Sequence, residues 1–494
     1  MLMGIDLGTS SLKVVVIDEN GILRGFGAES YAIHTPKPGF AEQDPHIWWD
    51  ACCNAIRQCF SGDINGKDIT AISFSGQMHG TVMLGSAGEV LGNAIIHCDG
   101  RSVEQVTAIE AILGREYIVN HVLNPIFPGF QIPTLLWLKE NESETFAQIK
   151  TVLSPKDYLR FRLTGDIITE NSDASATLAY DIRSGKLNIS LLDMVNLPAD
   201  IFPKSIESTT YAGYITKDAA ATTGLSPGTP VIAGGSDQVM QAIGNGVLSP
   251  GDATITIGTG GQVLFPTEVP IINPQLNTHT FSGARPGTWY VMGAMLSAGA
   301  CLNWLRKIMF DNQLSYIDMD SLAENAPAGS GGLMFLPSMR GERTPYLNPG
   351  LKGMFFGLSP EMDRGTLVRA VMEGVAFGMN ECLQTCISLG PTPNRVIASG
   401  GATRSKLWLQ IQADIYGQPL YLNNVTEHAA VGAAIVAGVG LGLYKDFQVG
   451  CSTAVKPAGE PVLPNMDNYM FYQERFQLFR QLYNSNMVNF ERGT

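Results

Sequence analysis

The sequence has little charge and no run of basic side chains. Lysine, arginine, aspartate and glutamate make up 16% of the 494 residues, and the formal net charge is −13. A surface for DNA or RNA needs clustered lysine and arginine, so we expect no nucleic-acid partner. The apolar content of 45% is typical of a globular chain and excludes disorder driven by excess charge.

Cysteine and histidine are sparse and scattered. The eight cysteines form no C-x-x-C pair, and the seven histidines do not cluster. This spacing favours free, buried thiols in a reducing compartment over disulfides or a zinc site. We therefore expect a cytoplasmic protein without structural zinc.

Neither a signal peptide nor a membrane span is indicated. Asp6 stands where the apolar core of a signal peptide would run. The uncharged stretch 429–444 is shorter than the roughly 20 residues that a span requires, and glycines interrupt it. We interpret it as a tightly packed core helix and expect no membrane association.

Two glycine-rich segments share one pattern of strand, tight turn and strand. They are GIDLGTSSLKVVVID at 4–18 and ATITIGTGGQVLF at 253–265. Two such hairpins, some 250 positions apart in a chain too long for one core, indicate a duplicated architecture. The loop signals in 244–251 place the boundary, so we expect domains at 1–245 and 246–494.

Strand-like and helical patterns alternate along the rest of the chain, which predicts an α/β protein. The expected strands are 69–74, 231–233 and 395–398. The expected helices are 44–60, 134–139, 364–389, 431–443 and a C-terminal helix around 470–488.

The hairpin turns are candidate phosphate-binding elements. The sequence has no G-x-x-x-x-G-K-[ST] motif, the phosphate loop of many ATP enzymes. Small residues at a tight turn let backbone N–H groups approach phosphate, and Thr9, Ser10 and Ser11 add hydroxyl donors. Asp6 precedes the first turn, where its carboxylate could hold Mg²⁺ directly or through water. An ordinary hairpin is the alternative at this point.

A resemblance to a known family favours the phosphate interpretation. GIDLGTSSLK resembles the first phosphate loop of the actin-like ATPase superfamily, in its FGGY branch of carbohydrate kinases. Seven further segments are similar to FGGY segments, most of all to those of xylulokinases. They are FAEQDPHIWWD (40–50), SGQMHG (75–80), PKDYLRFRLTG (155–165), AGGSDQ (233–238), GERTPYLNP (341–349), SGGATRS (399–405) and AAVGAAIVAG (429–438).

The resemblance implies two actin-like, ribonuclease H-like ATPase domains with a cleft between them. It implies an ATP- and Mg²⁺-dependent kinase acting on a small sugar, D-xylulose above all. A homodimer stays open because relatives are often dimers. By the resemblance and the hairpin pattern, the expected ATP contacts are Thr9, Ser10, Ser11, Gly258, Thr259, Gly260, Asn303, Gly400, Gly401 and Ala402.

Asp237 is the candidate catalytic base. It follows a glycine turn at a strand end near the domain boundary, and a carboxylate in a cleft can accept the proton of an attacking hydroxyl. An aspartate that caps the next helix is the alternative from spacing alone. The resemblance implies the base, and it implies sugar contacts for Gln77, Met78, His79, Asp99, Arg101 and Gln238.

The chain departs from the xylulokinase pattern beside these residues. His97-Cys98 precede Asp99 where many relatives read Trp-Asn, and Gln238 stands where many read Asn or Ala. Because a site built for one set of hydroxyls discriminates against another, another ketose, a polyol or an aldonate such as gluconate is the alternative substrate. A nucleotide switch of the actin type, without kinase activity, is a further alternative.

Overall fold

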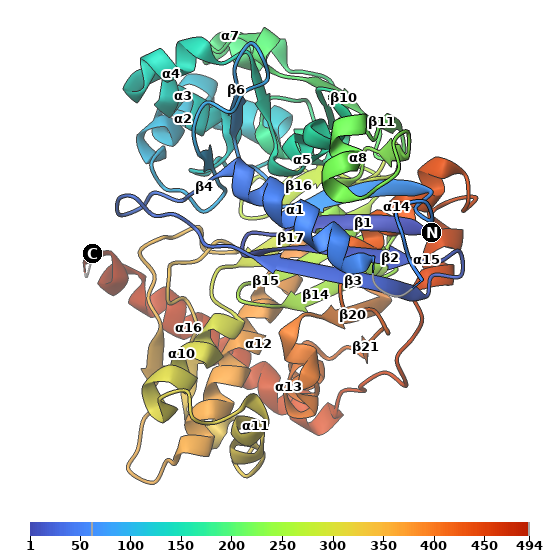
Figure 1. Ribbon diagram of the computed structural model, residues 1–494. Coiled ribbons are helices and arrows are strands. Elements are labelled where there is room, and N and C mark those ends of the chain that lie inside the picture. Colours follow the sequence, from blue (N-terminus) through green and yellow to red (C-terminus); the bar gives the residue numbers. More distant parts are fainter. Residues whose placement is uncertain (61–62, 493–494) are drawn as a thin grey trace.

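Two large β-sheets organise the chain in the computed structural model, which describes residues 1–60 and 63–492 (Figure 1). The first sheet has the order β11 (Tyr211–Tyr214), β12 (Pro230–Ile232), β5 (Ala71–Gly76), β1 (Leu2–Leu7), β2 (Ser11–Ile17) and β3 (Leu23–Ser30), and β13 (Gly235–Ser236) also pairs with β5. The second has the order β16 (His279–Ser282), β17 (Trp289–Met295), β15 (Gly261–Thr267), β14 (Asp252–Ile257), β20 (Arg395–Ser399) and β21 (Leu420–Tyr421).

The two sheets repeat one topology. β1 pairs antiparallel with β2 and parallel with β5, while β14 pairs antiparallel with β15 and parallel with β20. Each sheet therefore has a glycine-turn hairpin at its centre, and the expected duplication is confirmed. Both hairpins occur where the sequence predicted them.

Helix α1 (Pro45–Cys59) covers one face of the first sheet. Asp44 is its N-cap and accepts a hydrogen bond from the His46 N–H, and proline is suited to the first turn. Trp48 and Ala55 point into the core beneath this helix. The expected helix 44–60 is thus confirmed to within one residue at each end.

Helices α9 (Asp237–Gly244) and α14 (His428–Leu441) cover the opposite face of the first sheet. A Cβ at Gly4 of β1 would lie 1.9 Å from the Ala430 carbonyl oxygen. A Cβ at Gly432 would lie 1.9 Å from the Met240 carbonyl oxygen. Glycine is required at both positions because backbone atoms of another element occupy the space of a side chain.

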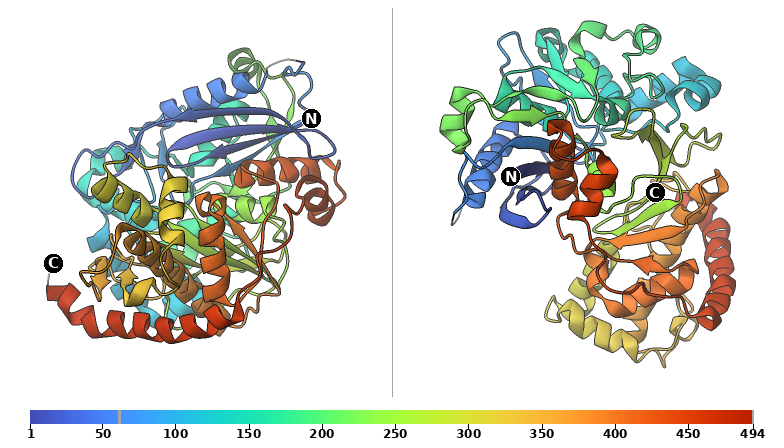
Figure 2. Two further views of the ribbon diagram at one scale, coloured as in Figure 1. Left: turned by 90° about the horizontal axis from the view of Figure 1, so that it is seen from below. Right: turned by 90° about the vertical axis from the view of Figure 1, so that its right-hand side faces the viewer.

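Helix α14 joins the two halves of the molecule. It follows the second sheet in the sequence, yet it packs on β1, β5 and α9, and Figures 1 and 2 place it beside the N-terminal strands. The hydrophobic cluster around it contains Leu2 and Ile232 from the first sheet and Leu264 and Ile397 from the second. The expected core helix 431–443 is confirmed, and no helix among the described residues is long and apolar enough to cross a membrane.

A set of shorter elements between β5 and β12 has its own core, at the top of Figure 1. Asn124 from this region exchanges hydrogen bonds with the backbone of Thr280, and Trp289 donates to the Ile182 carbonyl oxygen. These bonds attach the region to strands of the second sheet. Its helices include α2 (Val103–Tyr117), α3 (Gln131–Asn141), α4 (Ser143–Gln148), α6 (Asn171–Ala174) and α7 (Ile189–Met194). Helices α5 (Pro155–Thr164) and α8 (Lys217–Thr223) from the same stretch of chain pack into the core of the first sheet.

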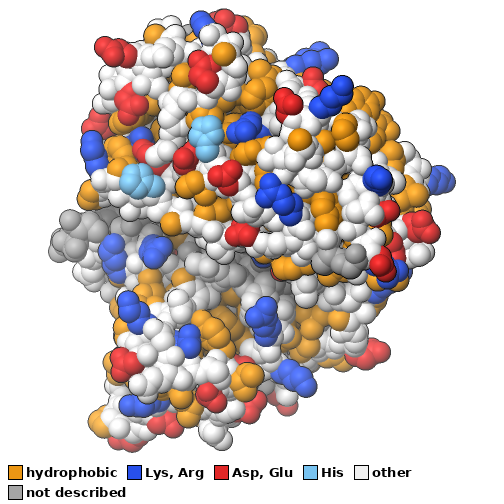
Figure 3. Space-filling view, in the orientation of Figure 1, with side chains coloured by type: hydrophobic (Ala, Val, Ile, Leu, Met, Phe, Trp, Pro, Cys, Tyr) orange, Lys and Arg blue, Asp and Glu red, His pale blue; other side chains and the backbone are white. Residues whose placement is uncertain are grey.

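The helices around the second sheet are α10 (Gly299–Phe310), α11 (Tyr316–Glu324), α12 (Arg364–Ser388), α13 (Lys406–Tyr416) and α16 (Met466–Arg492). α12 begins at the expected Arg364 and ends one residue early. The C-terminal helix α16 packs on its own half of the chain, where Tyr472 and Phe479 are fully buried. On the face in Figure 3, acidic and basic side chains are interspersed over both halves.

Candidate active site

The first hairpin presents a carboxylate just before an exposed turn. Asp6 is near the end of β1, and its Oδ1 accepts a hydrogen bond of 2.7 Å from the Ser75 hydroxyl on β5. The turn residue Ser10 is exposed, and Thr9 and Ser11 are half-buried. Burial raises the pKa of Asp6, while the Ser75 hydrogen bond and the charge of Lys13 oppose the rise. The turn is open to a ligand beside an acidic group.

The second hairpin brings most of the other expected ATP residues together. The Gly258 N–H donates to the Gly260 carbonyl oxygen across the turn (2.9 Å), and Thr259 at the tip is exposed. Gly299 at the start of α10 donates to the Gly258 carbonyl oxygen (2.9 Å). A Cβ at Gly400 would lie 2.5 Å from the Ile257 carbonyl oxygen, so this turn lies against the end of β14.

The remaining expected ATP residues differ in accessibility. Gly401 is exposed, Ala402 is buried in the core of the second half, and Asn303 is exposed one turn into α10. Asn303 accepts a hydrogen bond of 3.3 Å from the Tyr316 hydroxyl. Of these three, Gly401 and Asn303 present side-chain or backbone surface to a ligand.

Asp237 is the first residue of α9, and Ser236 is the N-cap. The capping alternative for Asp237 is therefore wrong. Its Oδ1 is buried and has no hydrogen-bond partner among the described residues. Burial, and then the negative charge of Asp6, raise the pKa of Asp237 to about 7, although hydrogen bonds from Gln238 lower it. A carboxylate with a pKa near neutrality suits a general base, because it is ionised at pH 7 and still basic enough to accept a proton.

The segment Gln77–His79 follows β5 directly, next to the first hairpin. The Gln77 N–H donates to the Leu7 carbonyl oxygen (2.8 Å), and the Met78 sulfur accepts from the Tyr290 hydroxyl (3.8 Å). His79 has a positive φ of 71° and donates from Nδ1 to the Ala176 carbonyl oxygen (2.8 Å). This bond fixes the tautomer and leaves Nε2 as a hydrogen-bond acceptor for a ligand.

Asp99 and Arg101 form a pair with almost no exposed surface. Their side chains are 0% and 2% exposed, and the Arg101 guanidinium donates to both Asp99 oxygens (2.9 Å each) and to Glu42 (2.6 Å). Asp99 also accepts from the Ala41 N–H (2.5 Å). The carboxylate is largely satisfied within the chain, and the guanidinium lies over the Phe40 ring.

Four residues outside the expected sugar contacts lie near His79: Phe127, His97, His279 and Arg343. The Arg343 guanidinium lies 4.8 Å from the Phe127 ring centroid, and Phe127 packs 5.7 Å from the His279 ring. Burial, followed by the charge of Arg343, lowers the pKa of His97 to about 4 and that of His279 to about 3. No hydrogen bond or ion pair of this guanidinium occurs within the described residues. GERTPYLNP was recognised in the sequence, but only folding places its arginine next to distant histidines.

A metal site made by the protein alone is absent from residues 1–60 and 63–492, since no group of three or more histidine, cysteine, aspartate or glutamate side chains could hold an ion. Mg²⁺ usually keeps several waters and binds one or two carboxylates together with substrate phosphates. Asp6 beside an open turn fits that mode of binding.

Comparison with known proteins decides the family. Residues 1–244 match the model of the FGGY family of carbohydrate kinases, N-terminal domain, and residues 253–441 match that of the C-terminal domain. The chain belongs to the FGGY family of carbohydrate kinases. It is therefore an enzyme that transfers phosphate to a carbohydrate, and kinases of this family use ATP as a substrate.

Individual relatives agree over almost the whole chain. The xylulose kinase of Staphylococcus epidermidis is 35% identical over 484 residues, covering 98% of this chain and 96% of the relative. A crystal structure of the xylulose kinase from Brucella ovis has a TM-score of 0.91 at 34% identity, covering 99% of both chains. The gluconate kinase of Lactobacillus acidophilus has a TM-score of 0.94 at 28% identity, covering 100% of this chain and 99% of that one. The expected two-domain, actin-like fold is confirmed.

Proposed function

We propose that this FGGY kinase converts D-xylulose and ATP to D-xylulose 5-phosphate and ADP. The proposal rests on curated relatives named xylulose kinase that span nearly the full chain. The observation that carries the mechanism is the unpartnered, buried oxygen of Asp237, in a segment that pairs with the end of β5. β5 leads directly into Gln77–His79, the expected sugar-binding segment.

The reaction transfers one phosphoryl group in line. The sugar hydroxyl oxygen forms a bond to the γ-phosphorus as the bond from that phosphorus to the β,γ-bridging oxygen breaks, and ADP leaves. The hydroxyl proton passes to the carboxylate of Asp237. His79 Nε2, Gln77 and Gln238 would orient the sugar so that the acceptor oxygen faces the phosphate, while the buried Asp99–Arg101 pair would support the pocket from behind.

The hairpin turns would hold the triphosphate through backbone N–H groups and the hydroxyls of Thr9, Ser10 and Thr259. Mg²⁺ would be held by Asp6 and the phosphate oxygens and would neutralise charge on the transferring group. Gly400, Gly401 and Asn303 would contact the adenosine end. In this arrangement the domain at 1–245 binds the sugar, and the domain at 246–494 binds most of the nucleotide.

Arg343 favours a second candidate, an aldonate such as gluconate. An unpaired guanidinium near His97 and His279 would attract a substrate carboxylate, and a bidentate bond would give it specificity. A structure of similar fold is named gluconate kinase. A ketose would offer this guanidinium only its carbonyl and hydroxyl oxygens.

Coupled ADP release with MgATP tests these candidates. The panel is D-xylulose, L-xylulose, D-ribulose, L-ribulose, D-fructose, glycerol, erythritol and gluconate. Preference for D-xylulose supports the first proposal. Preference for gluconate, lost in Arg343→Leu, supports the second. ATP turnover that ignores every sugar would contradict both and favour an actin-like nucleotide switch.

A further inference from the structure

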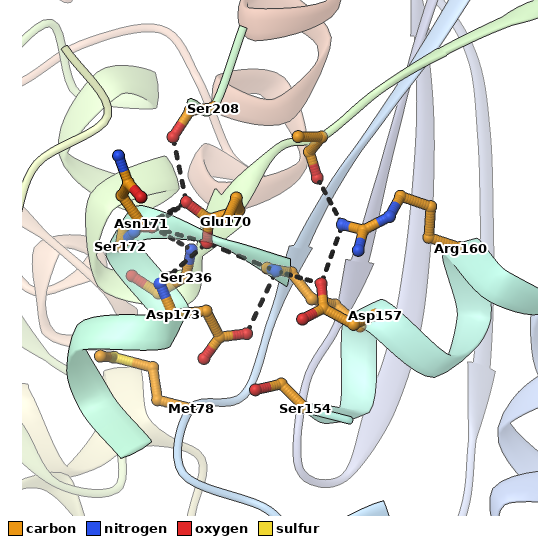
Figure 4. A network of polar contacts seen from close by, with 12 residues as sticks. Met78, Ser154, Asp157, Arg160, Glu170, Asn171, Ser172, Asp173, Ser208 and Ser236 are labelled. Carbon is orange, nitrogen blue, oxygen red and sulfur yellow. Dashed lines mark hydrogen bonds and ion pairs between the residues drawn. The ribbon is translucent and has the colours of Figure 1, made fainter. Parts of the chain in front are cut away.

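A cluster of buried charged side chains lies beside the backbone segment that ends at Asp237. These side chains have no role in the proposed phosphoryl transfer. Lys156, Asp157 and Arg160 come from α5, and Glu170 and Asp173 lie at the end of β9 (Ile168–Glu170) and in α6 (Figure 4). All five side chains are 0% exposed. Two cations face three carboxylates, and such burial is costly unless the groups are closely paired.

Lys156 is the centre of this cluster. Its Nζ lies 2.6 Å from Asp157, 3.2 Å from Asp173 and 3.4 Å from Glu170. Arg160 pairs with Asp157 at 2.8 Å. Burial alone would lower the pKa of Lys156, but the three carboxylates raise it, so the ammonium stays charged.

Two hydrogen bonds connect the cluster to the segment that ends at Asp237. Arg160 donates to the Ala233 carbonyl oxygen (3.2 Å). The Ser236 N–H donates to the Ser172 hydroxyl oxygen (2.9 Å), and that hydroxyl lies 2.9 Å from both Glu170 oxygens. The backbone on either side of Gly234-Gly235 is thus held by the charged cluster through named bonds.

The cluster also contacts the expected sugar-binding segment. A Cβ at Gly76 would lie 2.7 Å from the Cβ of Lys156, so the lysine packs directly against the backbone that leads into Gln77. Asp173 pairs with the Lys156 ammonium at 3.2 Å, and its negative charge contributes to the raised pKa of Asp237.

We propose that this cluster of five charged side chains, Lys156, Asp157, Arg160, Glu170 and Asp173, is a positioning device. It holds the Ala233–Ser236 backbone against the Gly76–Met78 backbone. It thereby fixes Asp237 relative to the acceptor hydroxyl of the sugar. This inference rests on the proposed role of Asp237. It assigns a function to Lys156, Asp157 and Arg160 of the segment PKDYLRFRLTG, which are fully buried and are not among the expected ATP or sugar contacts. Ser172 is the positioning residue through which the cluster acts on the Ser236 backbone.

Ser172→Ala tests the device with little loss of volume, and Ser208→Ala is the matched control. Ser208 also donates to Glu170 (3.1 Å), but its side chain makes no bond to 233–237. We expect kcat for the preferred sugar to fall roughly 10- to 100-fold in Ser172→Ala with KM for ATP unchanged, because a small misplacement of a reacting group is costly. Ser208→Ala should stay within about threefold of the parent. Equal losses in the two variants would overturn the proposal.

Asp173→Asn gives a second readout that a purely structural role would not produce. The charged or titratable groups facing Asp237 are Asp6 on β1, Asp173 on α6 and Tyr290 on β17. Burial raises the pKa of Asp173 to about 7, so Asp173 is ionised over the upper part of the acidic limb, where Asp173→Asn removes its negative charge and makes proton loss from Asp237 easier. The acidic limb of the kcat/KM profile should therefore move to lower pH by roughly half a unit. An unmoved limb would contradict an action of the cluster on Asp237.

Amide hydrogen exchange separates a failure of this proposal from a failure of the proposed function. Exchange in a peptide covering 233–240 requires no turnover. Ser172→Ala should exchange the Ser236 amide at least about tenfold faster than Ser208→Ala, because its acceptor is lost. Equal exchange overturns the positioning device even if the parent is an active kinase. Faster exchange with a parent inactive on every sugar leaves the device standing and rejects the proposed function.

Discussion

The two hairpins have the same strand pairing but differ in the side chain at the end of the central strand. Asp6 of β1 and Thr256 of β14 occupy equivalent registers, opposite Ser75 of β5 and Ser399 of β20. Ser75 donates to Asp6 at 2.7 Å, and Thr256 and Ser399 lie 2.7 Å apart. The same hydrogen bond thus joins the central strand to its parallel neighbour in both halves, but only the first half places a carboxylate in it.

The contrast extends to the neighbouring strand. Lys13 stands opposite Asp6 and pairs with Glu427 at 2.7 Å, whereas Gln262 stands opposite Thr256. At this register the first hairpin carries charged side chains, and the second carries neutral ones. Duplication therefore supplies two turns able to approach phosphate, and substitution at a single register makes one of them suited to a metal ion.

The largest effect is expected from making the first hairpin neutral. Asp6→Asn keeps the shape and the Ser75 contact but removes the negative charge beside the turn. We expect kcat to fall by about 10²-fold or more, because loss of one preorganised electrostatic contact has effects of that size. Thr256→Val at the equivalent register should cost less than about tenfold. Initial-rate measurements over a range of Mg²⁺ concentrations compare the two, and similar losses would contradict the asymmetry.

The next effect concerns the helices that join the two halves. Gly432→Ala would force a methyl group into the space of the Met240 carbonyl oxygen. We expect destabilisation of about 2–3 kcal/mol, as is typical of overpacking between rigid backbones. Gly442→Ala, where a Cβ would meet no atom within 4 Å but φ is 80°, controls for backbone strain alone. Denaturant unfolding measures both, and a Gly432→Ala variant as stable as the parent would contradict the close approach of α14 and α9.

A pH dependence is expected from the first half of the chain. Asp237 accepts a proton only when ionised, and its pKa is about 7. The value of kcat/KM should therefore fall about tenfold per pH unit below pH 7 and level off above it. In Asp6→Asn the acidic limb of the kcat/KM profile should shift to lower pH, since the charge of Asp6 raises the pKa of Asp237. A profile that is flat between pH 5.5 and 8 would contradict Asp237 as the base.

The smallest effect is on stability. The folded-state pKa of Asp237, about 7, lies above the value of about 3.9 in an unfolded chain, so folding favours the protonated form. The stability that the protonated Asp237 carboxyl contributes to the folded chain is therefore fully present below about pH 4 and is lost as the pH rises to 7. Asp237→Asn should thus be more stable than the parent at pH 8, by on the order of 1 kcal/mol after allowing for solvent screening, and equal to it below about pH 4. Thermal unfolding at both pH values checks the sign.

Local patterns made much of the fold predictable. The hairpins, α1, α12 and α14 follow from glycine turns and apolar periodicity, each of which is contained in one segment. The strand expected at 69–74 instead runs from Ala71 to Gly76. Its end is set by pairing with β1, which the sequence alone does not display.

The site was predictable where a motif marks it and not where folding assembles it. Asp6, Met78, His79 and Asp237 lie in recognisable segments. Arg343 and His279 come from the second half and His97 from the first, so only folding brings these side chains close enough for the charge of Arg343 to act on both histidines. The contacts of Lys156 likewise join segments 155–160 and 170–173. Apolar periodicity predicts none of these contacts, because each depends on tertiary packing.

Sugar-dependent ADP formation in Asp237→Asn tests the central claim most directly. Nucleotide binding is measured in the same preparation by titration with a fluorescent ATP analogue. The account predicts a loss of at least about 10²-fold in kcat with D-xylulose, with nucleotide affinity within about threefold of the parent. A variant that phosphorylates the sugar at the parental rate would contradict the assignment of Asp237 and the mechanism built on it.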